Sequence, residues 1–145
     1  MSELHPVAVH FPIVLALLWP VIDAVGLLLK RADVCRVGLA LLLLALLASV
    51  FATATGQAAF DEAIAKGAAP DVLNTHADNA NLIPWALVLV AAVRLAGAQK
   101  WQRKGQIAGI VLGVLLWPLV IGTGETGGKL VFEHAIGVKA AGSSR

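Results

Sequence analysis

Four histidines are the residues best suited to chemistry in this chain, because imidazole binds metals, ligates haem iron and transfers protons near neutral pH. His5 and His10 stand at the start of the first apolar segment, His76 precedes the third, and His134 follows the fourth. If these segments cross a membrane in turn, all four histidines lie at the same membrane face. Three carboxylates fall in the same layer: Asp78, Glu125 and Glu133.

The spacing of His5 and His10 limits what the two can do together. Five helical residues rotate by ~500° and rise by ~7.5 Å, so the two side chains point about 140° apart and cannot clamp one ion. His10 lies deeper, between Val9 and Phe11, and an ionisable residue at such a position is a functional candidate. We therefore expect His10 and His76 to hold a cofactor between the first and third segments, with His5 and His134 as further ligands or accessory groups.

Glycines near these histidines form a second candidate feature. Gly56 ends the second apolar segment, and Gly124, Gly127 and Gly128 end the fourth. Glycine lets a helix approach a neighbouring helix or a flat cofactor closely. The four glycines therefore predict either a haem pocket or tight helix packing.

Asp23 and Arg94 lie inside apolar segments. At a rise of 1.5 Å per helical residue, each is about 10 Å inside the membrane boundary on the side opposite the histidines. An unpaired charge there is costly, so we expect a structural ion pair between them.

The composition indicates an integral membrane protein. Hydrophobic residues make up 59% of the 145 residues and charged residues 14%, whereas soluble domains carry roughly 25% charged residues. The mean hydropathy is +0.83. The single cysteine, Cys35, excludes an intramolecular disulfide, and the net charge of +2 is not a nucleic-acid-binding signal because the basic residues cluster between apolar segments.

Four segments are long enough to cross a bilayer, which takes ~20 apolar residues in a helix. They cover about 7–29, 37–55, 80–98 and 106–123. The fold class is therefore all-α, a single four-helix transmembrane bundle over residues 1–145. In the long connection after the second span, we expect a short interfacial helix over Gln57–Lys66 and a new helix starting at Pro70. The string LLWP occurs at Leu17–Pro20 and Leu115–Pro118, on antiparallel spans, and gives little support for a repeat.

Charge sets the expected orientation, because Lys and Arg beside short loops stay in the cytoplasm. The two short turns carry seven basic residues and one acid: Lys30, Arg31, Arg36, Arg94, Lys100, Arg103 and Lys104, with Asp33. The opposite side carries four basic residues and seven acids: Lys66, Lys129, Lys139 and Arg145, with Glu3, Asp61, Glu62, Asp71, Asp78, Glu125 and Glu133. We therefore expect a multi-pass protein of a bacterial inner membrane, with both termini and the histidines on the periplasmic side.

Two strings carry a family resemblance: His5–Pro12, which reads HPVAVHFP, and Gly127–Val138, which reads GGKLVFEHAIGV. With Ala54–Gly56 and His76, they resemble a bacterial family of small four-helix predicted membrane proteins, a domain of unknown function with HPxxVHFP and GGxLVxxHxxGV motifs. Some members of that family are joined to Rieske or cytochrome c modules. The resemblance implies redox chemistry at the periplasmic face.

Three functions remain open at this point. The first is a b-type cytochrome, with one or two haems held by histidines, that transfers electrons between a quinol or membrane partner and a periplasmic carrier of cytochrome c or Rieske type. The second is a non-haem site that binds Cu, Zn or Fe through several histidines, with or without Glu125 or Glu133. The third is a structural or assembly subunit. Electron transfer is favoured over a stand-alone enzyme, and the oligomeric state stays open, a homo-oligomer included.

The orientation predicts the accessibility of Cys35, which lies among Lys30, Arg31 and Arg36. A membrane-impermeant thiol reagent should leave Cys35 unmodified in intact cells and label it after permeabilisation. Strong labelling of intact cells would reverse the orientation and place the histidines in the cytoplasm.

Overall fold

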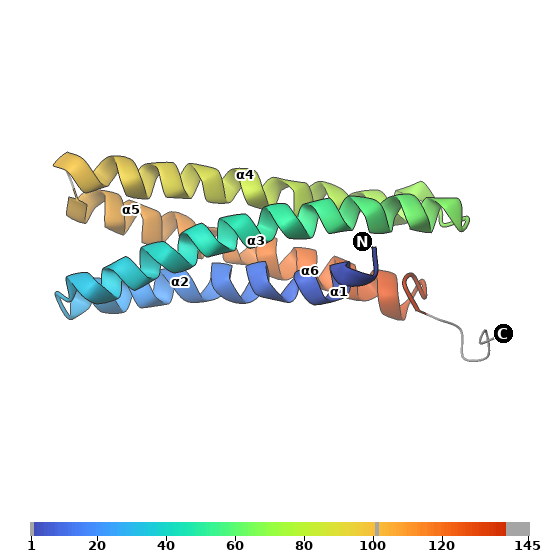
Figure 1. Cartoon of the computed structure of the whole chain (residues 1–145), viewed down its shortest axis with the longest axis horizontal. Helices are drawn as coiled ribbons and strands as arrows, with labels where there is room; N and C mark the ends of the chain where they lie inside the picture. The colour runs from blue at the N-terminus through green and yellow to red at the C-terminus, as the bar shows by residue number, and fades with distance from the viewer. Residues whose placement is uncertain (1, 101, 139–145) are drawn as a thin grey trace.

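The computed structural model describes residues 2–100 and 102–138, and all regular structure among them is helical. Four of its helical stretches are long and apolar enough to cross a membrane: Ser2–Leu28, Ala32–Ala65, Pro70–Ala96 and Arg103–Phe132. They form the elongated bundle in Figure 1, with α1 and the last turn of α6 at the same end. The four-helix membrane architecture expected from the sequence is confirmed. Lys139 and Arg145, which entered the charge count, lie outside the described residues.

Prolines divide two of the spans into shorter helices. The first span consists of a 3₁₀ turn at Ser2–Leu4, α1 (His5–Ala8) and α2 (His10–Leu28), and the fourth of α5 (Gln102–Leu115) and α6 (Trp117–Phe132). The breaks fall at Val9 and Leu116, within three residues before Pro12 and Pro118. Proline has no N–H to donate to the carbonyl four residues earlier, which weakens the helix there. The second span is the unbroken α3 (Ala32–Ala65), and the third is α4 (Pro70–Lys100).

The long connection between α3 and α4 is more helical than expected. Residues Gln57–Ala65 are the last turns of α3, so the separate interfacial helix expected there is wrong. The apolar segment loses hydrophobicity at Gly56, but the alanine-rich sequence that follows keeps its helix propensity. Gly67, with φ +91°, ends the helix, and α4 begins at Pro70 as expected.

Neighbouring spans are antiparallel, and spans that alternate along the chain lie diagonally across the bundle. The helix α2 packs against α3, α5 and α6, and α4 packs against the same three helices. The end that holds α1, the α3–α4 connection and the last turn of α6 is called the histidine end below. The opposite end, with the turn before α3, is called the Cys35 end.

Large apolar side chains cover the outside of the bundle, whereas the side chains of its interior are mostly small or closely packed. Only 22–33% of the most apolar window of each span is buried inside the protein, and exposed residues include Phe11, Leu47 and Trp85. The central core holds Trp19, Leu42, Ala45, Leu87, Val90 and Ala91. This arrangement suits lipid, in which helices associate through close packing and not by withdrawing apolar surface from water.

A buried ion pair joins α2 and α4 at the Cys35 end of the core. Arg94 Nε and Nη2 donate to the two carboxylate oxygens of Asp23 at 2.8 and 3.2 Å. Gln106 Nε2 donates to Asp23 Oδ1 at 3.0 Å and lies 2.9 Å from Cys35 Sγ. The side chain of Asp23 is fully buried and that of Arg94 is 6% exposed. Each charge therefore depends on the other for its stability in the membrane interior.

Removing one member of this pair should destabilise the protein more than removing both. Asp23→Asn or Arg94→Gln leaves an uncompensated buried ion, which costs about 3 kcal/mol, whereas the double variant leaves none. Thermal melts of the wild type, both single variants and the double variant in one detergent measure the coupling. Strictly additive losses would show that the two residues do not interact.

Candidate functional site

His5, in the first turn of α1, is fixed by two contacts with α3. Its Nδ1 lies 3.1 Å from the carbonyl oxygen of Ala52 and 3.2 Å from Thr55 Oγ1. A carbonyl oxygen can only accept a hydrogen bond, so Nδ1 carries a proton. In the neutral ring, Nε2 then has a free lone pair, which is the state required of a metal-ligating imidazole.

His76, near the start of α4, repeats this arrangement with α6. Its Nδ1 lies 3.1 Å from the carbonyl oxygen of Thr123 and 3.1 Å from Thr126 Oγ1. The Thr126 hydroxyl donates to the same Thr123 carbonyl at 3.0 Å, as Thr55 does to Ala52. Each hydroxyl proton is thereby committed, so the threonine oxygen faces the histidine as an acceptor.

The two imidazoles meet in the middle of the bundle. Their ring centroids are 6.5 Å apart and their planes make an angle of 74°. Both side chains are half-buried, although they come from spans that lie diagonally opposite. We call His5 and His76 the imidazole pair, and we call each histidine with its carbonyl, threonine and glycine partners a half-site.

One glycine supports each member of the pair. A Cβ atom on Gly56 would lie 2.9 Å from Cε1 of His5, and one on Gly127 would lie 3.0 Å from Cε1 of His76. The contact at Gly56 is shorter than real Cβ atoms make, and the contact at Gly127 is at the short limit, so a larger residue at either position would push against the imidazole. The other two candidate glycines are not in contact with the pair: Gly124 is near Ile13, and Gly128 has open space around it.

The remaining candidate ligands lie away from the imidazole pair. His10 and His134 are exposed, and neither has a contact that brings it to His5 or His76. Glu125 forms an ion pair with Lys129 at 3.1 Å, and Glu133 is exposed. Within the described residues, no group of three or more His, Cys, Asp or Glu side chains is placed to hold a metal ion. Of the four candidate histidines, the structure therefore brings two together, His5 and His76.

A buried stripe on the first span distinguishes His5 from His10. Ala8, Pro12, Ala16, Trp19 and Asp23 are all buried, and they follow one another at helical spacing. Extended by three residues, the stripe reaches His5, while His10 falls on the lipid-facing side. Followed from Asp23 towards the N-terminus in steps of three and four residues, this stripe selects His5. Thr55 and Thr126 were not recognised from the sequence, although each precedes a glycine and lies 50 residues after a histidine.

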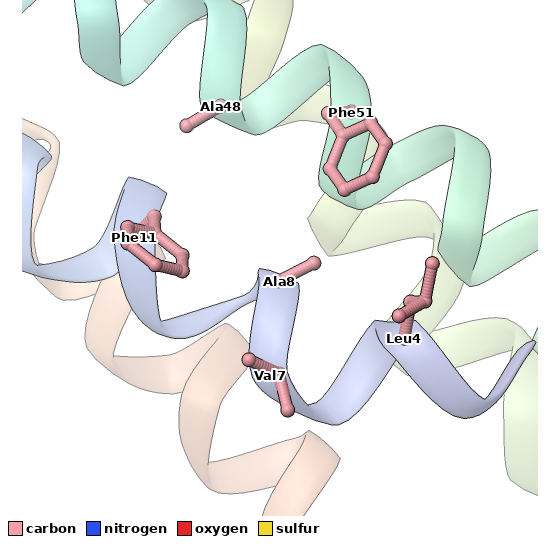
Figure 2. A pocket seen from close by; sticks show the side chains of 6 residues that line it. All are labelled: Leu4, Val7, Ala8, Phe11, Ala48 and Phe51. Carbon is pink, nitrogen blue, oxygen red and sulfur yellow. The ribbon is translucent and has the colours of Figure 1, made fainter. Parts of the chain in front are cut away.

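An apolar groove lies between the start of the first span and α3 (Figure 2). It has a volume of about 340 Å³ and is lined only by hydrocarbon side chains: Leu4, Val7, Ala8, Phe11, Ala48 and Phe51. It offers neither hydrogen bonds nor metal ligands, and a lipid chain suffices to fill it. The groove therefore adds no polar group to the imidazole pair.

Adjacent glycines of α6 allow a matched test of the site. Gly127→Ala should destabilise the protein by about 1–3 kcal/mol, because the new methyl group forces the His76 ring to move. Gly128→Ala, one residue later, meets no atom within 4 Å and should be neutral or slightly stabilising. Melting temperatures of the two variants in detergent check this, and equal melting temperatures would mean that His76 does not pack against Gly127.

Comparison with known proteins places the whole bundle in one family. No curated protein and no solved structure matches the chain. The profile of the DUF2231 family, described as a predicted membrane protein, matches residues 2–140, which include all four spans and both half-sites. The chain therefore belongs to the DUF2231 family of predicted membrane proteins.

Proposed function

We propose that this protein is a b-type cytochrome that holds one haem iron between His5 and His76 and transfers electrons near the membrane surface. The observation that carries the proposal is the imidazole pair itself, with both Nδ1 atoms fixed by backbone carbonyls and both Nε2 atoms free. Ligating histidines usually donate their second ring N–H to a carbonyl or carboxylate, which fixes the tautomer and the ring orientation.

The separation of the rings supports a shared iron. Two imidazoles on opposite faces of one metal, with bonds of ~2 Å, have centroids roughly 6 Å apart. The observed 6.5 Å agrees with that arrangement. When bound, haem would supply reversible one-electron chemistry, and the imidazoles of His5 and His76, with their hydrogen bonds, would set its potential. Gly56 and Gly127 keep the neighbouring backbones close to the imidazoles, and Thr55 and Thr126 hold the orientation of the rings.

The position of the pair favours a partner at one membrane surface over electron transfer through the membrane. All four histidines of the chain belong to one end, and the core of the bundle is formed by a cluster of apolar side chains that contains no histidine. With the orientation expected from the basic residues, this end faces the periplasm. A quinol or other membrane donor and a soluble acceptor of cytochrome c or Rieske type would suit that position.

A second candidate is a single Cu, Zn or Fe ion bound by the same two imidazoles. The specific observation in its favour is the close approach of the rings, because a bare ion needs only the space between them. A porphyrin also needs room at the sides of the two rings, which a bare ion does not. An edge-to-face contact without any ligand would also fall within the usual range of centroid distances, ~4.5–7 Å for aromatic rings.

Haem content distinguishes these possibilities. The wild type, expressed with sufficient haem, should show a Soret band and a pyridine haemochrome value near one haem per chain. His5→Ala and His76→Ala should each lower that value at least about tenfold, whereas His10→Ala and His134→Ala, at exposed positions, serve as matched controls and should retain it. A wild type without a Soret band would exclude the haem proposal, and one equivalent of bound metal in the same sample would support the bare-ion site.

A further inference from the structure

The two half-sites recur at the same spacing along the chain. Each histidine precedes its carbonyl partner by 47 residues and its threonine partner by 50 residues. In both cases the threonine is followed by the glycine against which the imidazole packs. The residue type matches at the histidine, the threonine and the glycine, and contact and spacing match also at the carbonyl partner. Such a match is not expected of two unrelated helical hairpins.

The same relation holds at the opposite end of the bundle. His5 and His76 are 71 residues apart in number, and so are Asp23 and Arg94. Cys35 and Gln106, which contact each other, are also separated by 71. Two more glycines follow the pattern: Gly38 lies against Asp23, and Gly109, 71 residues later, lies against Arg94.

A pseudo-two-fold axis along the bundle accounts for these contacts. If the hairpin of the first two spans is related to that of the last two by such an axis, a residue on the axis meets its own equivalent. His5 with His76, Asp23 with Arg94, and Cys35 with Gln106 are three such meetings. Repeats related by an axis along the membrane normal also occur in membrane transporters.

The core also fits this relation, because side chains of different size fill equivalent positions in the two halves. The indole ring of Trp19 occupies the space beside Gly113, where a Cβ would lie 2.4 Å from its Cζ2. The equivalent positions 71 residues away, Val90 and Leu42, hold two buried side chains of intermediate size. The large Trp19 and the glycine at position 113 form one pair, and the equivalent pair is the medium-sized Val90 and Leu42.

We propose that the chain is one helical hairpin duplicated in tandem, and that its two halves contribute equivalent half-sites to one ligand position on the axis between them. The inference rests on the proposed function for the identity of the ligand, a haem iron, but not for the equivalence of the halves. It answers the question of one or two haems, because a 6.5 Å separation of the rings leaves space for one metal atom between them. Thr55 and Thr126 are then paired positioning residues.

Paired substitutions in the two half-sites test the shared ligand. Thr55→Val and Thr126→Val should each weaken hemin binding by about 3–10-fold, as expected for loss of one hydrogen bond. Both should also shift the haem midpoint potential in the same direction, because each threonine sets the orientation and basicity of one axial imidazole. Hemin titration of the wild type should end at one equivalent. An end point of two, or a change confined to one variant of the pair, would overturn the shared position.

An exchange of residues across the axis tests the equivalence without any ligand. The fourfold variant Asp23→Arg, Arg94→Asp, Cys35→Gln and Gln106→Cys moves the buried cluster to the equivalent positions, where Gly109 and Gly38 provide matching space. It should fold with a melting temperature within about 5 °C of the wild type, a small change in stability for a protein of this size. The matched controls are Asp23→Arg alone and Arg94→Asp alone, which leave two like charges together and should melt much lower.

The two experiments separate the two proposals. A wild type that binds no hemin removes the haem function, while the exchange variant still decides whether the halves are equivalent. A fourfold variant that melts as low as either single variant overturns the duplication, whatever the hemin titration shows.

Discussion

The absence of water inside the bilayer is the constraint on which the rest of this structure depends. A polar group placed there must find its partner within the protein or bear a cost of several kcal/mol. Asp23 and Arg94 satisfy each other, with a further hydrogen bond to Asp23 from Gln106. His5 and His76 bind backbone carbonyls of neighbouring helices. All of these groups gather between the helices, and large apolar residues are left to face the lipid.

The same constraint explains which features could be read from the sequence. Span number and type follow from hydrophobic length, and an ion pair between Asp23 and Arg94 follows from the cost of two lone charges in lipid. The choice between His5 and His10 depends on the rotation of one helix, which depth alone does not determine. His10 was favoured because it lies deeper, yet the buried stripe that ends at Asp23 turns His5 inward. The length of α3 was also underestimated from hydropathy. Its last turns are polar, and a helix can continue beyond the point where its hydrophobicity falls.

The relation between the two halves was missed for a different physical reason. Lipid-facing positions accept almost any apolar residue, so they retain little trace of a common pattern. The strings that did match, Leu17–Pro20 and Leu115–Pro118, are not 71 residues apart, and they lie on spans of opposite direction. What persists is confined to close contacts, such as Gly38 and Gly109 against the ion pair, and Gly56 and Gly127 against the imidazoles. Contacts therefore reveal the repeat more clearly than sequence identity does.

In the function proposed for this chain, one polar contact across the centre of the bundle would serve stability and the other would serve a ligand. The ion pair is fully satisfied, whereas each imidazole keeps one free nitrogen. Electron paramagnetic resonance of the oxidised, purified protein tests this claim most directly, because the spectrum reports the axial ligands of the iron. The account predicts a low-spin ferric signal typical of two imidazole ligands. In His76→Ala that signal should be lost, and the small amount of haem that remains bound should be high-spin. A high-spin spectrum from the wild type, or a low-spin signal unchanged in that variant, would contradict it.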